Sequence, residues 1–495
     1  MPDHHVAIIG AGLSGIGMGI ALRRAGIEDF VVLERAGDIG GTWRDNTYPG
    51  IAVDIPAQAY QFTYELKPDW SRVFARGHEV KAYVDACADR YGIREHVRLH
   101  SDVTERAWDE EAGLWRLTAG GREITARFVI SAIGAFVDPK PCAIPGVEDF
   151  AGDVIHSARW DHDVELDGRR VAIVGTGASA VQIVPKVARR AARLDVYQRT
   201  PIWVGPKPDW RTPRAVEALF RRVPALQAAL RAATTRSVEA GLVTAVVRHD
   251  RVGFVTRGLA RLARATWYRW QVPDPELRSR LTPDYDIGCK RPAVSNSYLR
   301  TFMRDDVELV TDPIERVTAR GVRTADGAER EADVLVLATG FRMATDPENY
   351  RARPVRGRDG FDLAGFYETH RAASYESISL PGLPNHFMIF GPYGWTGGSW
   401  HVLVETASAH IVRVIEEAGR RGADVVEVRP EAAERWTRFA VERLGRSLWH
   451  TGACATANSY YFDRNGDTPF LRPTSSTEAW RAARTFPLED YRFAA

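Results

Sequence analysis

A glycine-rich loop of one pattern occurs twice in this chain, each time between an expected strand and an expected helix. The first copy is Gly10-Ala11-Gly12-Leu13-Ser14-Gly15, and the second is Gly175-Thr176-Gly177-Ala178-Ser179-Ala180. In such loops the first glycine permits a tight turn and the second lets a pyrophosphate approach the backbone. The third position, where alanine is tolerated, lets the helix pack on the strand. The repeat therefore predicts an α/β protein with two Rossmann-like dinucleotide-binding domains, a two-dinucleotide arrangement.

The residue that ends the next expected strand differs between the two copies. Glu34 stands 24 residues after Gly10, and Arg199 stands 24 residues after Gly175. A carboxylate accepts hydrogen bonds from a ribose diol but repels a 2′-phosphate. An arginine binds that phosphate in a bidentate manner, and Thr200 adds a hydroxyl. Because two dinucleotide sites in one chain imply hydride transfer between cofactors, we expect FAD at the first loop and NADPH at the second.

These patterns divide the chain into expected parts. The FAD-binding domain is expected in 1–145 and 346–495, and the NADPH-binding domain in 146–207 and 284–345. Between them, 208–283 is rich in arginine with interleaved apolar residues and predicts a helical insertion. Its pattern favours an amphipathic bundle with a solvated basic face over a helix on a membrane surface, and both interpretations stay open.

Composition and charge exclude several classes of function. With 495 residues the chain is too long for one core, and its net charge of +2 gives no reason to expect nucleic acid as a partner. The apolar run at 6–22 contains many glycines and is shorter than a membrane span, so we expect no integral span and no signal peptide. The four cysteines form no C-x-x-C pair. This argues against a disulfide framework, a metal site or a redox dithiol, and favours a cytoplasmic location.

One longer motif lies between the two glycine loops. Residues 150–161 read Phe-Ala-Gly-Asp-Val-Ile-His-Ser-Ala-Arg-Trp-Asp. They match the pattern F-x-G-x-x-x-H-x-x-x-W followed by Pro or Asp, and in this the chain resembles the type I (class B flavoprotein) Baeyer–Villiger monooxygenases. Related flavin-containing and N-hydroxylating monooxygenases usually lack the tryptophan. We interpret His156 as a structural residue in a linker between domains and Trp160 as interdomain packing.

The resemblance covers almost the whole chain and implies roles for individual residues. The segments 40–43, 48–54, 198–201, 288–291, 338–341 and 390–392 are all similar to the family's. They imply that Arg291 is catalytic and that Asp54 holds its guanidinium. The residues expected at FAD are Gly10, Gly12, Gly15, Glu34, Thr42, Trp43, Asp54, Tyr60, Val103 and Gly391. Those expected at NADPH are Gly175, Thr176, Gly177, Ala178, Ser179, Arg199, Thr200 and Lys290.

The reaction that the resemblance implies begins with hydride transfer from NADPH to FAD. Reduced flavin then takes up O₂ as an anionic C4a-peroxyflavin, which attacks a ketone and leads to an ester or lactone. Such chemistry requires a fixed cation near the developing negative charge, and arginine stays charged throughout. The chain departs from the family pattern at Val53, Ala57 and the segment 458–461, and the choice of ketone stays open.

Three other functions compete with this one. A sister flavin monooxygenase would oxygenate sulfur or nitrogen of a small molecule, and Trp160 with Arg291 favours the ketone reaction over it. An NADPH-dependent disulfide reductase needs a reactive dithiol, which the cysteine spacing does not offer. A non-enzymatic nucleotide-binding protein would have no use for two dinucleotide sites. The glycine-rich aromatic run 393–400 is equally compatible with a mobile substrate wall and with ordinary loop packing.

Overall fold

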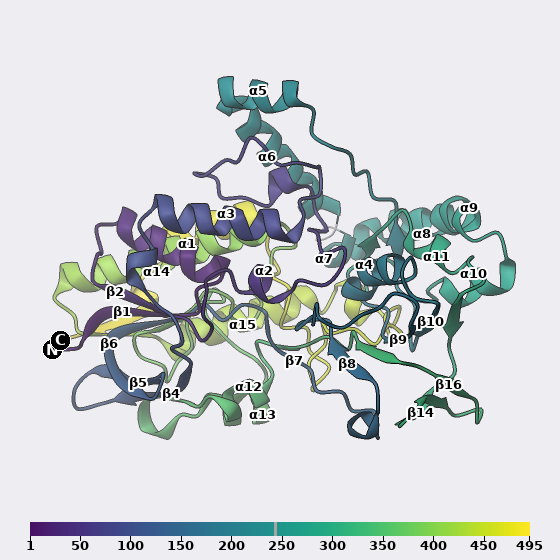
Figure 1. The fold of residues 1–495 in the computed structure, drawn as a ribbon. Coiled ribbons are helices and arrows are strands. Elements are labelled where there is room, and N and C mark those ends of the chain that lie inside the picture. Colours follow the sequence, from purple (N-terminus) through teal and green to yellow (C-terminus); the bar gives the residue numbers. More distant parts are fainter. Residues whose placement is uncertain (242–244) are drawn as a thin grey trace.

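The computed structural model describes residues 1–241 and 245–495 and contains two separate parallel βαβ units (Figure 1). The first consists of β1 (His4–Ile9), α1 (Leu13–Arg24) and β2 (Phe30–Leu33), with Val6 in register with Phe30. Val6, Ala7 and Ile8 are fully buried, as expected for a parallel strand covered on both faces. The sheet order is β19-β4-β5-β6-β1-β2-β3, and β20 also pairs with β6. The added strands are β3 (Val97–Arg98), β4 (Val103–Asp109), β5 (Leu114–Ala119), β6 (Arg122–Ser131), β19 (Val355–Arg356) and β20 (His386–Met388).

The second unit forms a smaller sheet that is parallel throughout. The βαβ unit itself consists of β9 (Arg170–Val174), α4 (Ala178–Val187) and β10 (Arg193–Tyr197). The strand order is β13-β10-β9-β17-β8, where β13 is Val307–Val310, β17 is Val334–Leu337 and β8 is Asp153–His156. Each unit thus has the strand–loop–helix–strand arrangement predicted from its glycine loop, and the fold class is confirmed.

His156 does not lie in a linker, and that expectation is wrong. It is the last residue of β8 and pairs with Leu337 of β17, so it belongs to the edge of the second sheet. Its Nδ1 accepts a hydrogen bond from the Ala158 N–H at 3.1 Å, and its Nε2 lies 3.3 Å from the Thr339 hydroxyl. The ring therefore fixes the turn that follows β8. Trp160 is buried in the main hydrophobic core.

Helices cover one side of the first sheet, and two others project from the molecule. Figure 1 shows α1, α3 (Gly77–Arg90) and α14 (Trp400–Arg421) on one side of the first sheet, and α5 with α6 standing out from the molecule. The expected insertion is helical where it is described: α5 (Arg214–Arg222), α6 (Pro224–Glu239), α7 (Ala245–Val247), α8 (His249–Ala263), α9 (Arg269–Gln271) and α10 (Pro275–Leu281). Residues 242–244 of that insertion lie outside the described residues.

The remaining elements connect the two units or close their ends. The helices are α2 (Thr42–Asp45), α11 (Tyr298–Thr301), α12 (Pro347–Ala352), α13 (Leu363–Thr369), α15 (Pro430–Leu444) and α16 (Ser476–Thr485). Small sheets are formed by β7 (Phe136–Pro139) with β18 (Phe341–Met343), β11 (Val204–Gly205) with β12 (Ala293–Val294), and β21 (Val425–Val428) with β22 (Tyr491–Ala494). A further sheet contains β14 (Ile314–Thr318), β15 (Gly321–Thr324) and β16 (Glu329–Glu331). Among the described residues, no helix is long and apolar enough to cross a membrane.

Candidate active site

One cavity of about 1740 Å³ connects the two glycine loops. Small-molecule sites usually have volumes of roughly 300–1,000 Å³, so this cavity has room for more than one ligand. The predicted residues that line it are Gly10, Gly12, Glu34, Thr42, Trp43, Asp54, Tyr60, Val103, Gly175, Thr176, Gly177, Ala178, Ser179, Arg199, Thr200, Lys290 and Arg291. Gly15, Gly391, His156 and Trp160 are not in its lining.

The first glycine loop has the close contacts that its sequence requires. Gly10 has a φ of +102°, which disfavours any other residue. A Cβ at Gly15 would lie 1.8 Å from the Gly10 carbonyl oxygen, so Gly15 serves the packing of α1 on the loop. A Cβ at Gly12 would have its nearest neighbour 3.6 Å away, and the residue faces the cavity. The loop can therefore admit a pyrophosphate at Gly12 next to the N-terminus of α1.

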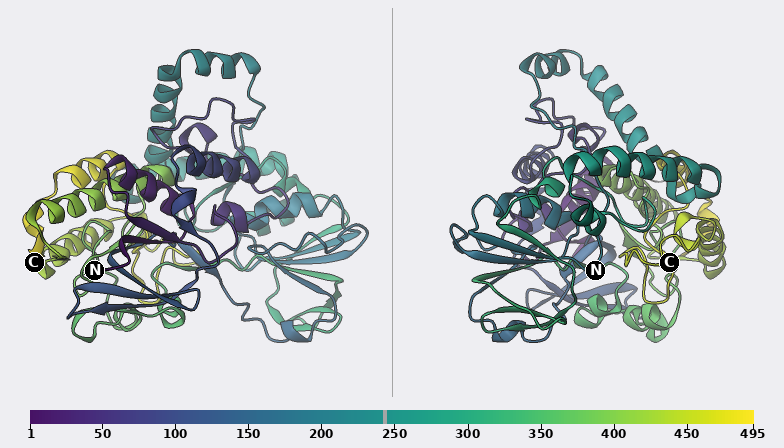
Figure 2. Two further views of the ribbon diagram at one scale, coloured as in Figure 1. Left: turned by 60° about the vertical axis from the view of Figure 1, so that its left-hand side comes forward. Right: turned by 90° about the vertical axis from the view of Figure 1, so that its right-hand side faces the viewer.

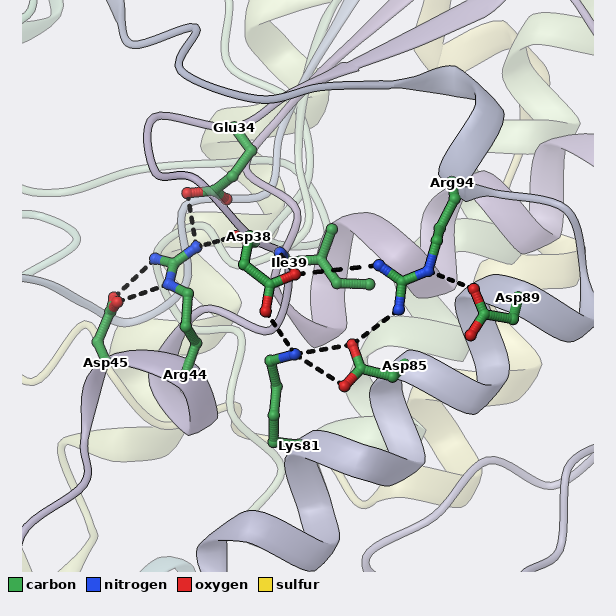
Figure 3. Close-up of polar contacts among 9 residues, drawn as sticks. All are labelled: Glu34, Asp38, Ile39, Arg44, Asp45, Lys81, Asp85, Asp89 and Arg94. Carbon is green, nitrogen blue, oxygen red and sulfur yellow. Dashed lines mark hydrogen bonds and ion pairs between the residues drawn. The ribbon is translucent and has the colours of Figure 1, made fainter.

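Glu34 is buried and already takes part in several polar contacts (Figure 3). Its Oε2 accepts the Ala11 N–H at 2.8 Å, and its Oε1 accepts from Arg44 at 2.9 Å. Arg44 also pairs with Asp45, while Lys81 joins Asp38 to Asp85. The network holds Glu34 at the strand end and also fixes the 38–45 loop. Sequence reasoning missed Arg44, because its pairing with Glu34 depends on how that loop folds.

Trp43, Tyr60 and Val103, which are expected at FAD, all line the cavity. Trp43 Nε1 donates to the Tyr60 hydroxyl at 3.1 Å, and burial raises the pKa of Tyr60 well above its usual value. Val103 begins β4 and is buried against the cavity. Beside it, Arg106 is buried, and its Nε and Nη1 find no hydrogen-bond partner among the described residues. A buried donor without a partner costs free energy, so these atoms fit a bound ligand that supplies acceptors.

Arg291 and Asp54 form a two-point ion pair beside the cavity, although 237 residues separate them in sequence. Arg291 Nη2 donates to Asp54 Oδ1 at 2.9 Å, and Nε donates to the other carboxylate oxygen. Burial would raise the pKa of Asp54, but the charge of Arg291 outweighs it and lowers that pKa. The guanidinium also lies over the Trp395 ring, 5.2 Å from its centre. Both groups are therefore ionised and held in place, with part of each side chain still exposed.

A pair of cations lies at the other glycine loop. Arg199 is exposed at the end of β10, and Thr200 follows it in the cavity wall. Burial and the nearby charge of Arg199 lower the pKa of Lys290 to about 8. The charges of Arg199 and Lys290 repel one another, and a bound phosphate dianion would relieve that repulsion. With its amide oxygen turned toward the guanidinium, Asn458 accepts from Arg199 Nη2 and Nε at 2.5 and 2.7 Å.

A disulfide joins the C-terminal loop that carries Asn458 to the segment that carries Arg291. Cys289 and Cys454 form a disulfide, which contradicts the expectation drawn from the scattered cysteines. The absence of a C-x-x-C pair does not exclude this disulfide, because the fold brings together two cysteines that are 165 positions apart in the sequence. Cys87 and Cys142 are free. Trp449 Nε1 also donates to the Gly288 carbonyl at 2.9 Å, so the loop and the segment that carries Arg291 form one unit.

Gln182 is a further link that sequence reasoning missed. It lies in α4 of the second unit, and its amide bonds both the N–H and the C=O of Ala52, at 3.1 and 3.0 Å. Ala52 belongs to the loop that leads to Asp54. The contact therefore sets the loop of the first unit against the helix of the second. Of the aromatic run 393–400, Trp395 and Trp400 line the cavity, and both contact Phe390 or Phe470.

Proteins of known family are similar to this chain over most of its length. Residues 7–240 match the family model described as pyridine nucleotide-disulphide oxidoreductase. A Baeyer–Villiger monooxygenase of Streptomyces coelicolor is 39% identical over 492 residues, covering 98% of this chain and 92% of the relative. The chain belongs to the Baeyer–Villiger monooxygenase family. A second Baeyer–Villiger monooxygenase, from Pseudomonas aeruginosa, is 38% identical over 91% of this chain and 84% of its own length.

Solved structures of similar proteins agree with this membership. A crystal structure of OTEMO in complex with FAD and NADP superposes with a TM-score of 0.88 at 27% identity, covering all of both chains. An oxidised steroid monooxygenase bound to NADP superposes with a TM-score of 0.85 at 27% identity, covering 99% of each chain. The resemblance first seen at residues 150–161 thus extends over the whole fold, and the recognition of the family is confirmed.

Proposed function

We propose that this protein is a monooxygenase that uses FAD, NADPH and O₂ to convert a ketone to an ester or lactone. The observation that carries the proposal is the Arg291–Asp54 ion pair, which lies in the cavity that both glycine loops share. Membership of the Baeyer–Villiger family supports it. When bound, FAD takes hydride from NADPH and activates O₂.

The residues of this chain would bind and orient these partners. Gly12 and the N-terminus of α1 hold the FAD pyrophosphate, Glu34 faces the adenosine ribose, and Arg106 supplies donors nearby. Gly177 leaves room for the NADPH pyrophosphate, because no atom of the described residues lies within 4 Å of a Cβ built there. Arg199, Thr200 and Lys290 bind the 2′-phosphate, which replaces Asn458 on the Arg199 guanidinium. We assign 1–145 with 346–495 to the FAD-binding domain, 146–207 with 284–345 to the NADPH-binding domain, and 208–283 to the insertion.

Arg291 stabilises the negative charge that develops when oxygen attacks the ketone. A guanidinium held by Asp54 needs no reorganisation at that moment, and burial strengthens its effect. Because the pKa of Arg291 is raised further by Asp54, it donates hydrogen bonds without releasing a proton. The rings of Trp395 and Phe470 contact each other in the cavity wall and would limit the access of water to this point.

Substrate screening tests the proposal directly. NADPH oxidation is measured with linear, cyclic, aryl and steroidal ketones, and products are identified by mass spectrometry. The expected result is NADPH oxidation that depends on a ketone, with one oxygen atom inserted next to the carbonyl. A sulfide and a tertiary amine serve as matched substrates for the alternative reaction. Turnover of these two, with no ester formed from any ketone, would contradict the proposal.

A further inference from the structure

The helix α8 (His249–Ala263) carries its large apolar side chains on the outside of the molecule. Phe254, Leu259 and Leu262 are 69%, 55% and 58% exposed. The residues that face the protein are small or polar, since His249, Gly253, Thr256 and Ala260 are the buried ones. An ordinary surface helix has the opposite arrangement, with its apolar stripe against the core. In the right-hand view of Figure 2, the teal helices of this segment lie across the face turned toward the viewer.

The apolar stripe continues beyond α8 and is bordered by arginines. Trp270, in α9, is 61% exposed, and Arg300 lies 4.7 Å from the centre of its ring. Arg257 and Arg261 are one helical turn apart and form a row beside Phe254. Within the part of the chain that the structure describes, neither arginine has a salt bridge, and Asp250 is the one acidic residue between 249 and 270. The exposed face of α8 thus combines apolar side chains with arginines, and these include Arg251, one turn before Phe254.

We propose that α8 docks this protein on the surface of an anionic lipid bilayer. The helix would lie in the interface, with Phe254, Leu259 and Leu262 among the acyl chains and the arginines at the lipid phosphates. Arginine side chains extend from apolar surroundings to headgroups in this way, and tryptophan favours the same depth.

Charge and shape favour a bilayer over a protein partner. Two copies of this chain related by a two-fold axis that crosses this stripe at right angles to α8 would bring the Arg257–Arg261 rows together, and like charges repel. A single convex helix also offers no groove into which a partner could insert a side chain, whereas lipid molecules can rearrange around it. The inference concerns location on a surface and is independent of which substrate the enzyme oxidises.

Vesicle flotation of the FAD-loaded full-length protein tests the proposal. The probes are vesicles of equimolar phosphatidylglycerol and phosphatidylcholine, and vesicles of phosphatidylcholine alone. We expect binding to the anionic vesicles at least tenfold stronger than to the neutral ones, and weaker binding at high salt. Phe254→Ser with Leu262→Ser, and separately Arg257→Glu with Arg261→Glu, should each reduce that binding at least tenfold.

Matched controls lie on α15, where Arg438 and Phe439 are also exposed. Phe439→Ser and Arg438→Glu should leave vesicle binding unchanged, and every variant should keep the wild-type rate of NADPH oxidation in free solution. No binding to anionic vesicles, or equal binding to both kinds, would overturn the proposal. So would light scattering that shows a wild-type dimer in the absence of lipid and a monomer for the Phe254→Ser variant, because the stripe would then be a contact between copies.

Discussion

At the scale of single residues, the proposed chemistry depends on a few charges that the fold holds in place. Arg291 gains its fixed position from Asp54, because two hydrogen bonds orient the guanidinium plane. Lys290, the preceding residue, has no such carboxylate partner among the described residues, and burial lowers its pKa to about 8. Neighbouring cations thus have different properties: one is permanently charged and rigid, and the other titrates near neutral pH.

Arg199 sets the choice of coenzyme in this account. Arg199→Ala removes a bidentate contact to the 2′-phosphate, which NADH lacks, so it should weaken NADPH use far more than NADH use. A hydrogen bond to a charged group contributes about 1.5–3 kcal/mol, which is roughly a tenfold or larger rise in KM for NADPH. Steady-state kinetics with both coenzymes measure this. An equal effect on the two coenzymes would show that the 2′-phosphate binds elsewhere.

We expect Lys290 to make NADPH binding depend on pH. Its lowered pKa of about 8 means that it is charged below pH 8 and becomes neutral as the pH rises through that value. The kcat/KM for NADPH should therefore fall above about pH 8, while that for NADH changes less. Lys290→Arg is the matched variant, since arginine stays charged and should remove the dependence. A wild-type profile for NADPH that is flat from about pH 7 to 9 would contradict the assignment.

At the scale of elements, local patterns were predictable and tertiary contacts were not. Both βαβ units could be predicted from the sequence. A loop that binds a pyrophosphate requires glycines at fixed positions between an apolar strand and a helix, and both parts of this pattern are visible in the sequence. The helices that follow the two loops end at Arg24 in α1 and at Val187 in α4. The place of His156 was not predictable, because a four-residue edge strand has little apolar signal. The Arg44–Glu34 contact depends on loop conformation, and no spacing rule reveals it.

The disulfide joins two elements whose relation the sequence does not indicate. With Cys289 and Cys454 bonded, the denatured protein without reductant should present two titratable thiols, Cys87 and Cys142, and four after reduction. Alkylation followed by mass spectrometry counts them. Cys454→Ser should free the loop that carries Asn458 and alter KM for NADPH by a few-fold, while Cys142→Ser should not. Four free thiols in protein alkylated during lysis would show that the pair stays reduced.

At the scale of the whole molecule, loops from two sheets line the one cavity that we propose as the active site. The sequence predicts both loops and, through the family resemblance, names Asp54, Lys290 and Arg291, which line the cavity between them. It does not predict the cavity itself, because Gln182 and the C-terminal loop set the two units against each other through contacts distant in sequence. Gly391 shows the converse: it belongs to a family-like segment, yet it packs against Ser377 away from the cavity lining.

The most direct test of this account separates cofactor reduction from oxygen transfer in Arg291→Ala. The variant should still bind FAD and be reduced by NADPH under anaerobic conditions in stopped flow, because the glycine loops and Arg199 are intact. After O₂ is admitted with a good ketone, ester formation should fall by about 10²–10³, since one fixed donor to the developing charge is lost. NADPH should then be consumed with release of hydrogen peroxide, and Arg291→Lys should restore little activity. An Arg291→Ala enzyme that forms ester at close to the wild-type rate would contradict the account.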